Sequence, residues 1–125
     1  MSTAVKSSFL SRSRTSGGEA AEGPGPIDRF LDAVWMERGL SPNTLAAYRA
    51  DLSALDRWLD EHSGSLERAQ RGDILSFMAS RVQAGARPRS TARQLSSFRR
   101  FYRYLVREGV LREDPTAQIA MPKVG

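Results

Sequence analysis

The chain contains no cysteine, and its single histidine, His62, stands in the turn-like stretch HSGS. Without cysteine there is no disulfide, thiolate metal site or cysteine nucleophile. A lone histidine with no second histidine and no carboxylate pair beside it is typical of an exposed turn, not of a metal ligand or general base. We therefore predict no cofactor and no metal, and an enzyme in its own right is the least favoured class.

Long apolar runs are missing as well. No stretch is long enough to span a bilayer, and the N-terminus lacks the apolar centre of a signal peptide. We expect a cytoplasmic protein with no membrane partner. No alternating strand pattern and no Asn-Gly or Asp-Gly hairpin occurs, so the sequence predicts an all-α fold.

Acidic residues are absent between Asp73 and Glu108, an interval that holds eight arginines, at 81, 87, 89, 93, 99, 100, 103 and 107. The whole chain carries a net charge of +5, and 17 of its 19 basic residues are arginine. A general bias toward arginine would explain that total equally well, but not the acid-free interval. Like charges three or four apart on a helix cost roughly 0.2 to 0.5 kcal/mol per pair, so this segment predicts an external anion, such as a polyphosphate.

The segment from Arg87 to Arg107 has the periodicity of an amphipathic helix, with Leu95, Phe98, Tyr102 and Leu105 on one side. Ser90 is its predicted N-cap, and Gly109 is predicted to end it. On or near the opposite side lie Arg93, Ser96, Ser97, Arg100, Arg103 and Arg107.

Two earlier helices are predicted from the same kind of pattern. The first runs from Ile27 to Gly39, with an apolar stripe of Ile27, Phe30, Leu31, Val34 and Trp35. The second opens with Ser41 as N-cap and Pro42 at the first helical position. Its buried stripe is Leu45, Tyr48, Leu52, Leu55 and Leu59.

The outer face of the second helix is predicted to carry mostly small side chains, from Asn43, Ala46, Ala47, Ala50, Ala54 and Arg57. Alanines on a solvent-facing side are often only good helix formers. They also allow the backbone to approach a groove closely, with Asn43 and Thr44 placed to meet a phosphate or a base edge. Both interpretations remain open from the sequence.

A third helix is predicted from about Gly72 to Gly85, with Ile74, Phe77, Met78 and Val82 inward, and a short fifth one from Asp114 to Ile119. Residues 1–26 are rich in small and polar side chains and predict a disordered tail. The helical domain is then 27–120. Residues 121–125 are read as the start of a linker to an absent domain.

Three motifs occur in order: S-P-N-T-L-x-x-Y at 41–48, S-x-x-R-x-L-S-x-x-R-x-F-Y-x-Y-L at 90–105, and D-P-T-A-x-I-x-x-P-K at 114–123. Together they resemble the N-terminal core-binding domain of tyrosine site-specific recombinases, over Ile27 to Lys123. The resemblance implies a four-helix SAM-like domain with a short fifth helix. It further implies one arm of a C-shaped clamp on double-stranded DNA, at a recombination half-site.

The resemblance also implies a catalytic domain that would follow Gly125 and carry the tyrosine nucleophile. Tyr48, Tyr102 and Tyr104 are therefore not expected to be that nucleophile. The implied partners are a second recombinase of the same family and a DNA translocase, acting in chromosome dimer resolution. The first and last helices would pack on neighbouring subunits.

The resemblance assigns DNA contacts by position. It implies that Arg93 and Gln94 read base edges, guanine and adenine respectively. Arg99 lies between the two faces of its helix and either braces the fold or touches a phosphate. Ser90 is more simply explained as a cap. The full candidate set is Asn43, Thr44 and Ala47 from the second helix, and Arg87, Arg89, Ser90, Thr91, Arg93, Gln94, Ser97, Arg100 and Arg103 from the fourth helix and the loop before it, with Arg87, Arg89, Arg100 and Arg103 on phosphates.

Two other functions compete. A stand-alone helical DNA-binding regulator would act without a downstream domain, and the linker-like ending PKVG argues against it. A helical adaptor for an acidic protein would need an apolar docking patch among the arginines, where the predicted face offers serines and Tyr104.

Overall fold

A computed structural model describes residues 23–120, and within them the secondary structure is entirely helical. The elements are α2 (Pro26–Arg38), α3 (Pro42–Glu61), the 3-10 turn η2 (Leu66–Arg68), α4 (Arg71–Gln83) and α5 (Pro88–Arg107). The predicted all-α fold with four main helices is thus confirmed. Residues 1–22 and 121–125 lie outside the described part, and with them nearly all of the predicted tail and the linker start.

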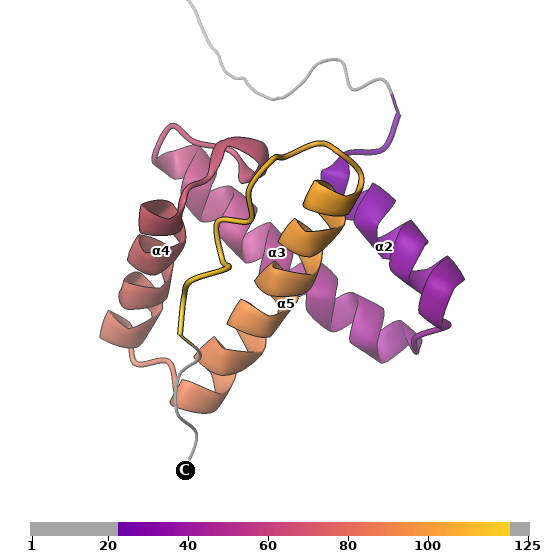
Figure 1. The fold of residues 1–125 in the computed structure, drawn as a ribbon. Coiled ribbons are helices and arrows are strands. Elements are labelled where there is room, and N and C mark those ends of the chain that lie inside the picture. The colour runs from indigo at the N-terminus through magenta and orange to yellow at the C-terminus, as the bar shows by residue number, and fades with distance from the viewer. Residues whose placement is uncertain (1–22, 121–125) are drawn as a thin grey trace, which may run out of the picture.

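Helix α5 lies at the centre of the fold and crosses in front of α3, with α2 on one side and α4 on the other (Figure 1). It contacts all three of these helices. Its central place explains why its side chains dominate the core, since Leu95, Phe98, Phe101, Tyr102 and Leu105 are each at most 2% exposed. The other helices add Phe30, Leu31, Leu52, Leu55, Leu59, Ile74, Phe77 and Met78.

The α2–α3 junction has the predicted end signals. Gly39 takes the left-handed conformation, with φ of 60°, and its N–H donates to the Trp35 carbonyl at 2.9 Å. The Ser41 hydroxyl then accepts from the Thr44 N–H at 3.2 Å, and Pro42 occupies the first helical position. Glycine tolerates positive φ without strain, which allows this abrupt change of direction.

Helix α5 begins three residues earlier than a cap at Ser90 implies, so the prediction of Ser90 as N-cap is wrong. The cap residue is Arg87, which is extended, with φ of −77° and ψ of 151°, and makes no side-chain cap hydrogen bond. A residue before proline is pushed out of the helical region, and Pro88 is itself well suited to the first helical position. Ser90 therefore lies inside the first turn.

The predicted short helix from Asp114 to Ile119 is also wrong, because this segment forms consecutive turns. One Asp114 carboxylate oxygen accepts from both the N–H and the hydroxyl of Thr116, at 2.8 and 2.6 Å. Thr116 and Ile119 are buried, so tertiary contacts hold the segment down. A stretch this short gains too few internal hydrogen bonds to be helical by itself.

Two side chains predicted to be buried are exposed instead: Trp35 by 52% and Val82 by 61%. Each stands near the end of its helix, one turn after a residue that is buried, Leu31 and Met78 respectively. Trp35 lines an open groove between α2 and α3, together with Leu45. The helical periodicity of α2 and α4 is as predicted, but the neighbouring helices do not cover Trp35 and Val82 in the last turn of each.

Candidate nucleic-acid interface

One side of α5 carries a row of exposed arginines: Arg89, Arg93, Arg100, Arg103 and Arg107. We call these five residues the arginine ridge. At about 100° per residue they fall within roughly 80° of the helix circumference, together with Ser96. The ridge follows almost the full length of the helix and ends on the connection that carries Arg87. The predicted arginine face of this helix is thus present on the surface.

Two members of the ridge are neutralised by acids from other helices. Arg107 forms a bidentate pair with Glu37 of α2, at 3.0 and 2.8 Å, and a weaker contact with Glu108. These hydrogen bonds, above all that to Glu37, raise the pKa of Arg107. Arg93 pairs with Asp51 of α3 at 2.6 Å. The local sequence offered no such acids, so the fold corrects the expectation of a row without neutralisation.

Four candidate arginines keep their charge uncompensated. Within residues 23–120, Arg87, Arg89, Arg100 and Arg103 form no ion pair with a described carboxylate. All four are exposed. Exposed arginines without an acidic partner are available as bidentate donors to phosphate oxygens.

Arg100 and Arg103 also border a notch between α5 and α2. The cavity is small, about 150 Å³, and its lining includes Arg38, Arg107 and the half-buried Tyr104. Glu37 is the one acid in that lining, against four arginines. Arg38 was not among the predicted residues, because it belongs to a different helix and only the packing of α2 on α5 brings it here.

A buried carboxylate joins the two helices that carry the candidate residues. Asp51 is 1% exposed, and its two oxygens accept from the Arg93 guanidinium at 2.6 Å and from the Ser97 hydroxyl at 2.7 Å. Sequence reasoning missed it, although the signal existed. Asp51 stands next to Leu52 on the inward part of the helix, and a buried carboxylate requires a cation or several donors.

Three predicted contact residues of α5 are buried: Thr91, Gln94 and Ser97, at 2%, 5% and 2% exposure. The Thr91 hydroxyl donates to the Pro88 carbonyl, and Gln94 accepts from Arg81 at 3.3 Å. Placing Ser97 on the open side was therefore wrong. A helix packed on three neighbours buries a wider arc than one apolar stripe, and these polar residues form the edges of that arc.

On α3 the predicted residues are partly accessible. Asn43 is exposed, whereas Thr44 and Ala47 are half-buried beside Asp51, which lies on the same side of the helix. The N-terminal ends of α3 and α5 both point to the lower part of the molecule in Figure 1. Helix N-termini carry partial positive charge, which favours an anion near this end of the domain.

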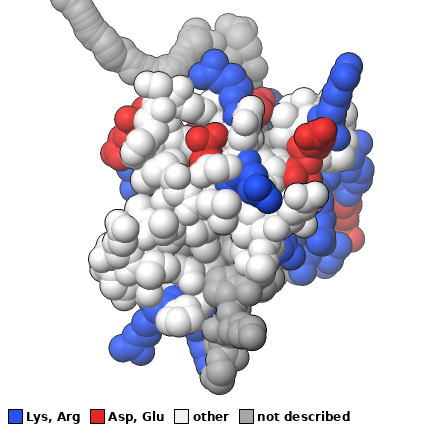
Figure 2. Space-filling model, turned by 60° about the vertical axis from the view of Figure 1, so that its left-hand side comes forward, with Lys and Arg blue, Asp and Glu red and all other residues white. Residues whose placement is uncertain are grey.

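The surface view is consistent with this at the lower end of the molecule. Figure 2 shows basic side chains there with no acidic one in view, whereas the middle, the top and the right-hand edge carry both signs. Because this view is turned only about the vertical axis, its lower end is the one that holds the α4–α5 connection.

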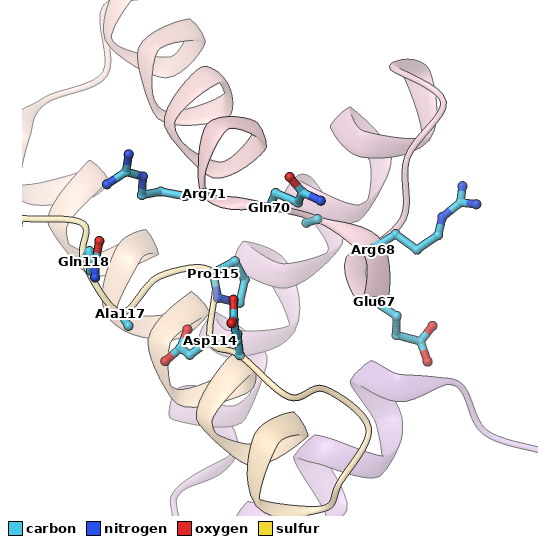
Figure 3. A pocket seen from close by; sticks show the side chains of 10 residues that line it. Glu67, Arg68, Gln70, Arg71, Asp114, Pro115, Ala117 and Gln118 are labelled. Atoms are coloured by element: carbon cyan, nitrogen blue, oxygen red, sulfur yellow. The ribbon is translucent and has the colours of Figure 1, made fainter.

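A larger groove, of about 1000 Å³, lies between η2 and the turns at 113–118. Its lining mixes charges of both signs, and the side chains of Arg68 and Arg71 point away from each other (Figure 3). No cluster of His, Asp or Glu fit to hold a metal ion exists among the described residues. The groove therefore offers no convergent set of catalytic or ligating groups.

All three tyrosines take part in the packing of the core. Tyr102 is fully buried, its hydroxyl donates to the Leu66 carbonyl at 2.8 Å, and burial raises its pKa well above the ordinary value. Tyr48 and Tyr104 are half-buried and pack around Phe30, with ring centroids 5.9 and 5.6 Å from it. Their rings serve packing. Over residues 23–120, no helix has the length and apolar character needed to cross a membrane.

Comparison with known proteins agrees with this arrangement. Residues 27–109 match the family described as "Phage integrase, N-terminal SAM-like domain". The chain is 54% identical over 99 residues to the tyrosine recombinase XerD of Pseudomonas putida, and 50% identical over 99 residues to that of Pseudomonas aeruginosa. The tyrosine recombinase XerD of Yersinia pestis is 49% identical over 98 residues.

These alignments cover 79%, 79% and 78% of this chain but 33% of each relative, so the chain spans about a third of their length. The family match contains the four helices of the described fold, apart from the first residue of α2, and the arginine ridge. The chain belongs to the phage integrase family, through its N-terminal SAM-like domain.

Proposed function

We propose that this domain binds double-stranded DNA, and that it clamps a recombination half-site with the face formed by α3 and α5. The observation that supports this most is the arginine ridge, flanked by Arg87, in which only two of five members have an acidic partner among residues 23–120. A row of guanidinium groups without counter-charges suits a polyphosphate surface.

Within this proposal the side chains divide by exposure. Arg87, Arg89, Arg100 and Arg103 contact phosphates, which position the domain, and Arg93 meets a base edge or a phosphate near the helix crossing. From α3, Asn43 contacts DNA directly, while Thr44 and Ala47 let the backbone come close. Buried Thr91, Gln94 and Ser97 act by holding α5 in place, and half-buried Ser90 shapes its first turn.

For the full-length protein we propose a XerD-like tyrosine recombinase whose catalytic domain follows this one. The support is the name shared by the relatives and the third of their length that the chain spans. Such a protein would integrate and recombine DNA in the cytoplasm with a XerC-like partner recombinase. Under a DNA translocase of the FtsK type, it would resolve chromosome dimers and so serve chromosome partition and cell division.

An NMR titration tests the DNA proposal. The domain is titrated with a duplex that carries a recombinase half-site and with a scrambled duplex, at two salt concentrations. We expect shifts confined to residues 43–50 and 87–103, stronger for the half-site. Equal, salt-erased shifts would mean that the domain only positions itself on DNA. No shift with either duplex would reject DNA binding and favour an adaptor for an acidic protein.

A pair of double variants gives the matched control. Arg100→Gln with Arg103→Gln removes two charges from the arginine ridge. Arg68→Gln with Arg71→Gln removes the same charge from the groove of Figure 3. Only the first pair should weaken binding strongly. Equal weakening would show that net charge alone is responsible.

A further inference from the structure

A buried negative charge lies directly beneath the face that we propose to bind a polyanion. Asp51 belongs to α3, and both partners of its carboxylate belong to α5: Arg93 at 2.6 Å and Ser97 at 2.7 Å. A purely electrostatic DNA surface would gain by having no carboxylate at this place. Electrostatic attraction of DNA therefore does not explain why a carboxylate lies at this position.

Arg93 is the only member of the pair that reaches solvent. Its side chain is 59% exposed, against 1% for Asp51. One terminal nitrogen donates to Asp51, and no other side-chain donor of Arg93 has a partner among the described residues. Since a guanidinium carries five N–H donors in a rigid plane, fixing one of them orients the others.

The carboxylate is itself held in place. The Ser97 hydroxyl occupies its second oxygen, one helical turn after Arg93, so both donors approach from the same side of α5. Thr44, Ala47 and Ala54 lie on the same side of α3 as Asp51, and all three have small side chains. A charge-assisted bond in such a buried, doubly bonded setting restricts the rotamers of Arg93 far more than a surface pair would.

We propose that Asp51 is a positioning residue that holds Arg93 in its DNA-contacting orientation before DNA arrives. The inference rests on the proposed DNA-binding function and deepens it. A free arginine side chain loses rotamer freedom when it binds, at a cost that lowers affinity. Because Asp51 and Ser97 already restrict the rotamers of Arg93 in the free domain, Arg93 loses less conformational entropy when it contacts a base edge or a phosphate.

The proposal predicts an effect opposite to that of simple electrostatics. Asp51→Asn removes a negative charge from the DNA-facing side, which should strengthen polyanion binding if charge alone mattered. We expect it instead to weaken half-site binding by about 3- to 10-fold, the range for losing the order of one long side chain. Ser97→Ala, which changes no charge, should weaken binding in the same direction but less.

Two charge-matched variants complete the binding experiment. Asp60→Asn removes an equal charge from the exposed far end of α3 and should leave affinity within about twofold of the wild type. Glu37→Gln releases Arg107 from its pair and should strengthen binding, as charge alone predicts. Fluorescence anisotropy with the half-site and the scrambled duplex supplies the affinities, and urea unfolding confirms that each variant is folded.

A readout on the free domain guards against a variant that fails to fold. In NMR spectra of the wild-type side chains, the guanidinium of Arg93 should rotate slowly and show separate N–H signals, while that of Arg100 averages. Ser97→Ala should speed the rotation of Arg93. Fast rotation in the wild type, or tighter half-site binding by folded Asp51→Asn, would overturn the positioning role and leave DNA binding intact. Absence of wild-type binding would reject DNA binding and this role together.

Discussion

Single side chains carry much of the stability of this domain, and Tyr102 is the clearest case. Its ring is fully buried and its hydroxyl donates to the Leu66 carbonyl, which ties α5 to the η2 connection 36 residues away. Neither group has access to water as a substitute partner. The bond is therefore worth more than an exposed one, because removing it leaves a buried acceptor unsatisfied.

Tyr102→Phe should lower the free energy of unfolding by about 1 to 2 kcal/mol, the cost of leaving the Leu66 carbonyl unpaired. Tyr104→Phe is the matched control. Its ring is half-buried and its hydroxyl makes no hydrogen bond with a described residue, so we expect a change below about 0.5 kcal/mol. Urea unfolding at neutral pH measures both, and equal costs would contradict the role of the bond.

Alkaline pH provides an independent check on Tyr102. Burial raises its folded-state pKa above the ordinary value of 10.0. Protonated Tyr102 therefore contributes stability that is fully present below the unfolded pKa and is lost as the pH rises above it. Tyr102→Phe should unfold with a weaker pH dependence in this alkaline range than the wild type does.

Asp56 is predicted to destabilise the fold at neutral pH. Its pKa is raised from the ordinary 3.8, first by desolvation and then by the negative charges of Asp60 and Glu67. Because the carboxyl pKa is higher in the folded state than in the unfolded state, the contribution of Asp56 to stability is most favourable at a pH below its unfolded-state pKa. That contribution falls as the pH rises through the folded-state pKa. Asp56→Asn should thus raise the free energy of unfolding by on the order of a few tenths of a kcal/mol at neutral pH.

The pH dependence of the same variant is the control. The gain in stability from Asp56→Asn should vanish when thermal unfolding is measured at a pH below 3.8, the ordinary pKa of an aspartate. A gain that persists in acid would point to helix propensity or packing as its cause.

At the scale of elements, the ends of the helices decide where the chain turns. Gly39 has φ of 60°, and nothing lies within 4 Å of the place where a Cβ would be. Gly39→Ala should therefore lower the free energy of unfolding by about 1 kcal/mol through backbone strain alone, since L-residues disfavour the left-handed region of positive φ. Chemical denaturation of the purified domain measures the change.

Gly72 is the natural comparison for Gly39. It lies inside the first turn of α4, and its Cβ would also meet open space. Gly72→Ala should stabilise by about 0.5 to 1 kcal/mol, because alanine is the better helix former. If both substitutions changed stability in the same direction, positive φ at Gly39 would not explain its role.

At the scale of the whole molecule, the distribution of charge predicts the salt dependence of DNA binding. Four arginines without described acidic partners predict a slope of log K against log salt of about −3.6, a loss of roughly 150-fold between about 50 and 200 mM salt. Arg100→Gln with Arg103→Gln should reduce the slope to about −1.8. Anisotropy titrations over that range supply the slopes.

The double variant in the groove of Figure 3 is the control for this measurement. Arg68→Gln with Arg71→Gln should leave the slope near that of the wild type, because these side chains line the groove of Figure 3, whose lining contains no residue of the arginine ridge. A loss of slope equal to that of the ridge variant would mean that all arginines contribute alike.

The sequence by itself determined the four main helices and most of the apolar side of each, but not the segment from Asp114 to Ile119, where the predicted helix is wrong. Ser41 before Pro42 and Gly39 after a helical stripe act through local backbone geometry, so they can be read without the fold. The same holds for Leu95 and Phe98, whose spacing admits only one face. The arginine face of α5 was visible for that reason.

Only the tertiary structure decided how those charges are shared. Asp51 and Glu37 reach the arginine ridge from 42 and 70 residues away along the chain, and no local pattern encodes such pairs. Burial of Thr91, Gln94 and Ser97 depends on α5 having three neighbours, which a single helical stripe cannot reveal. Local rules act over one or two turns, whereas ion pairing and burial depend on which surfaces meet.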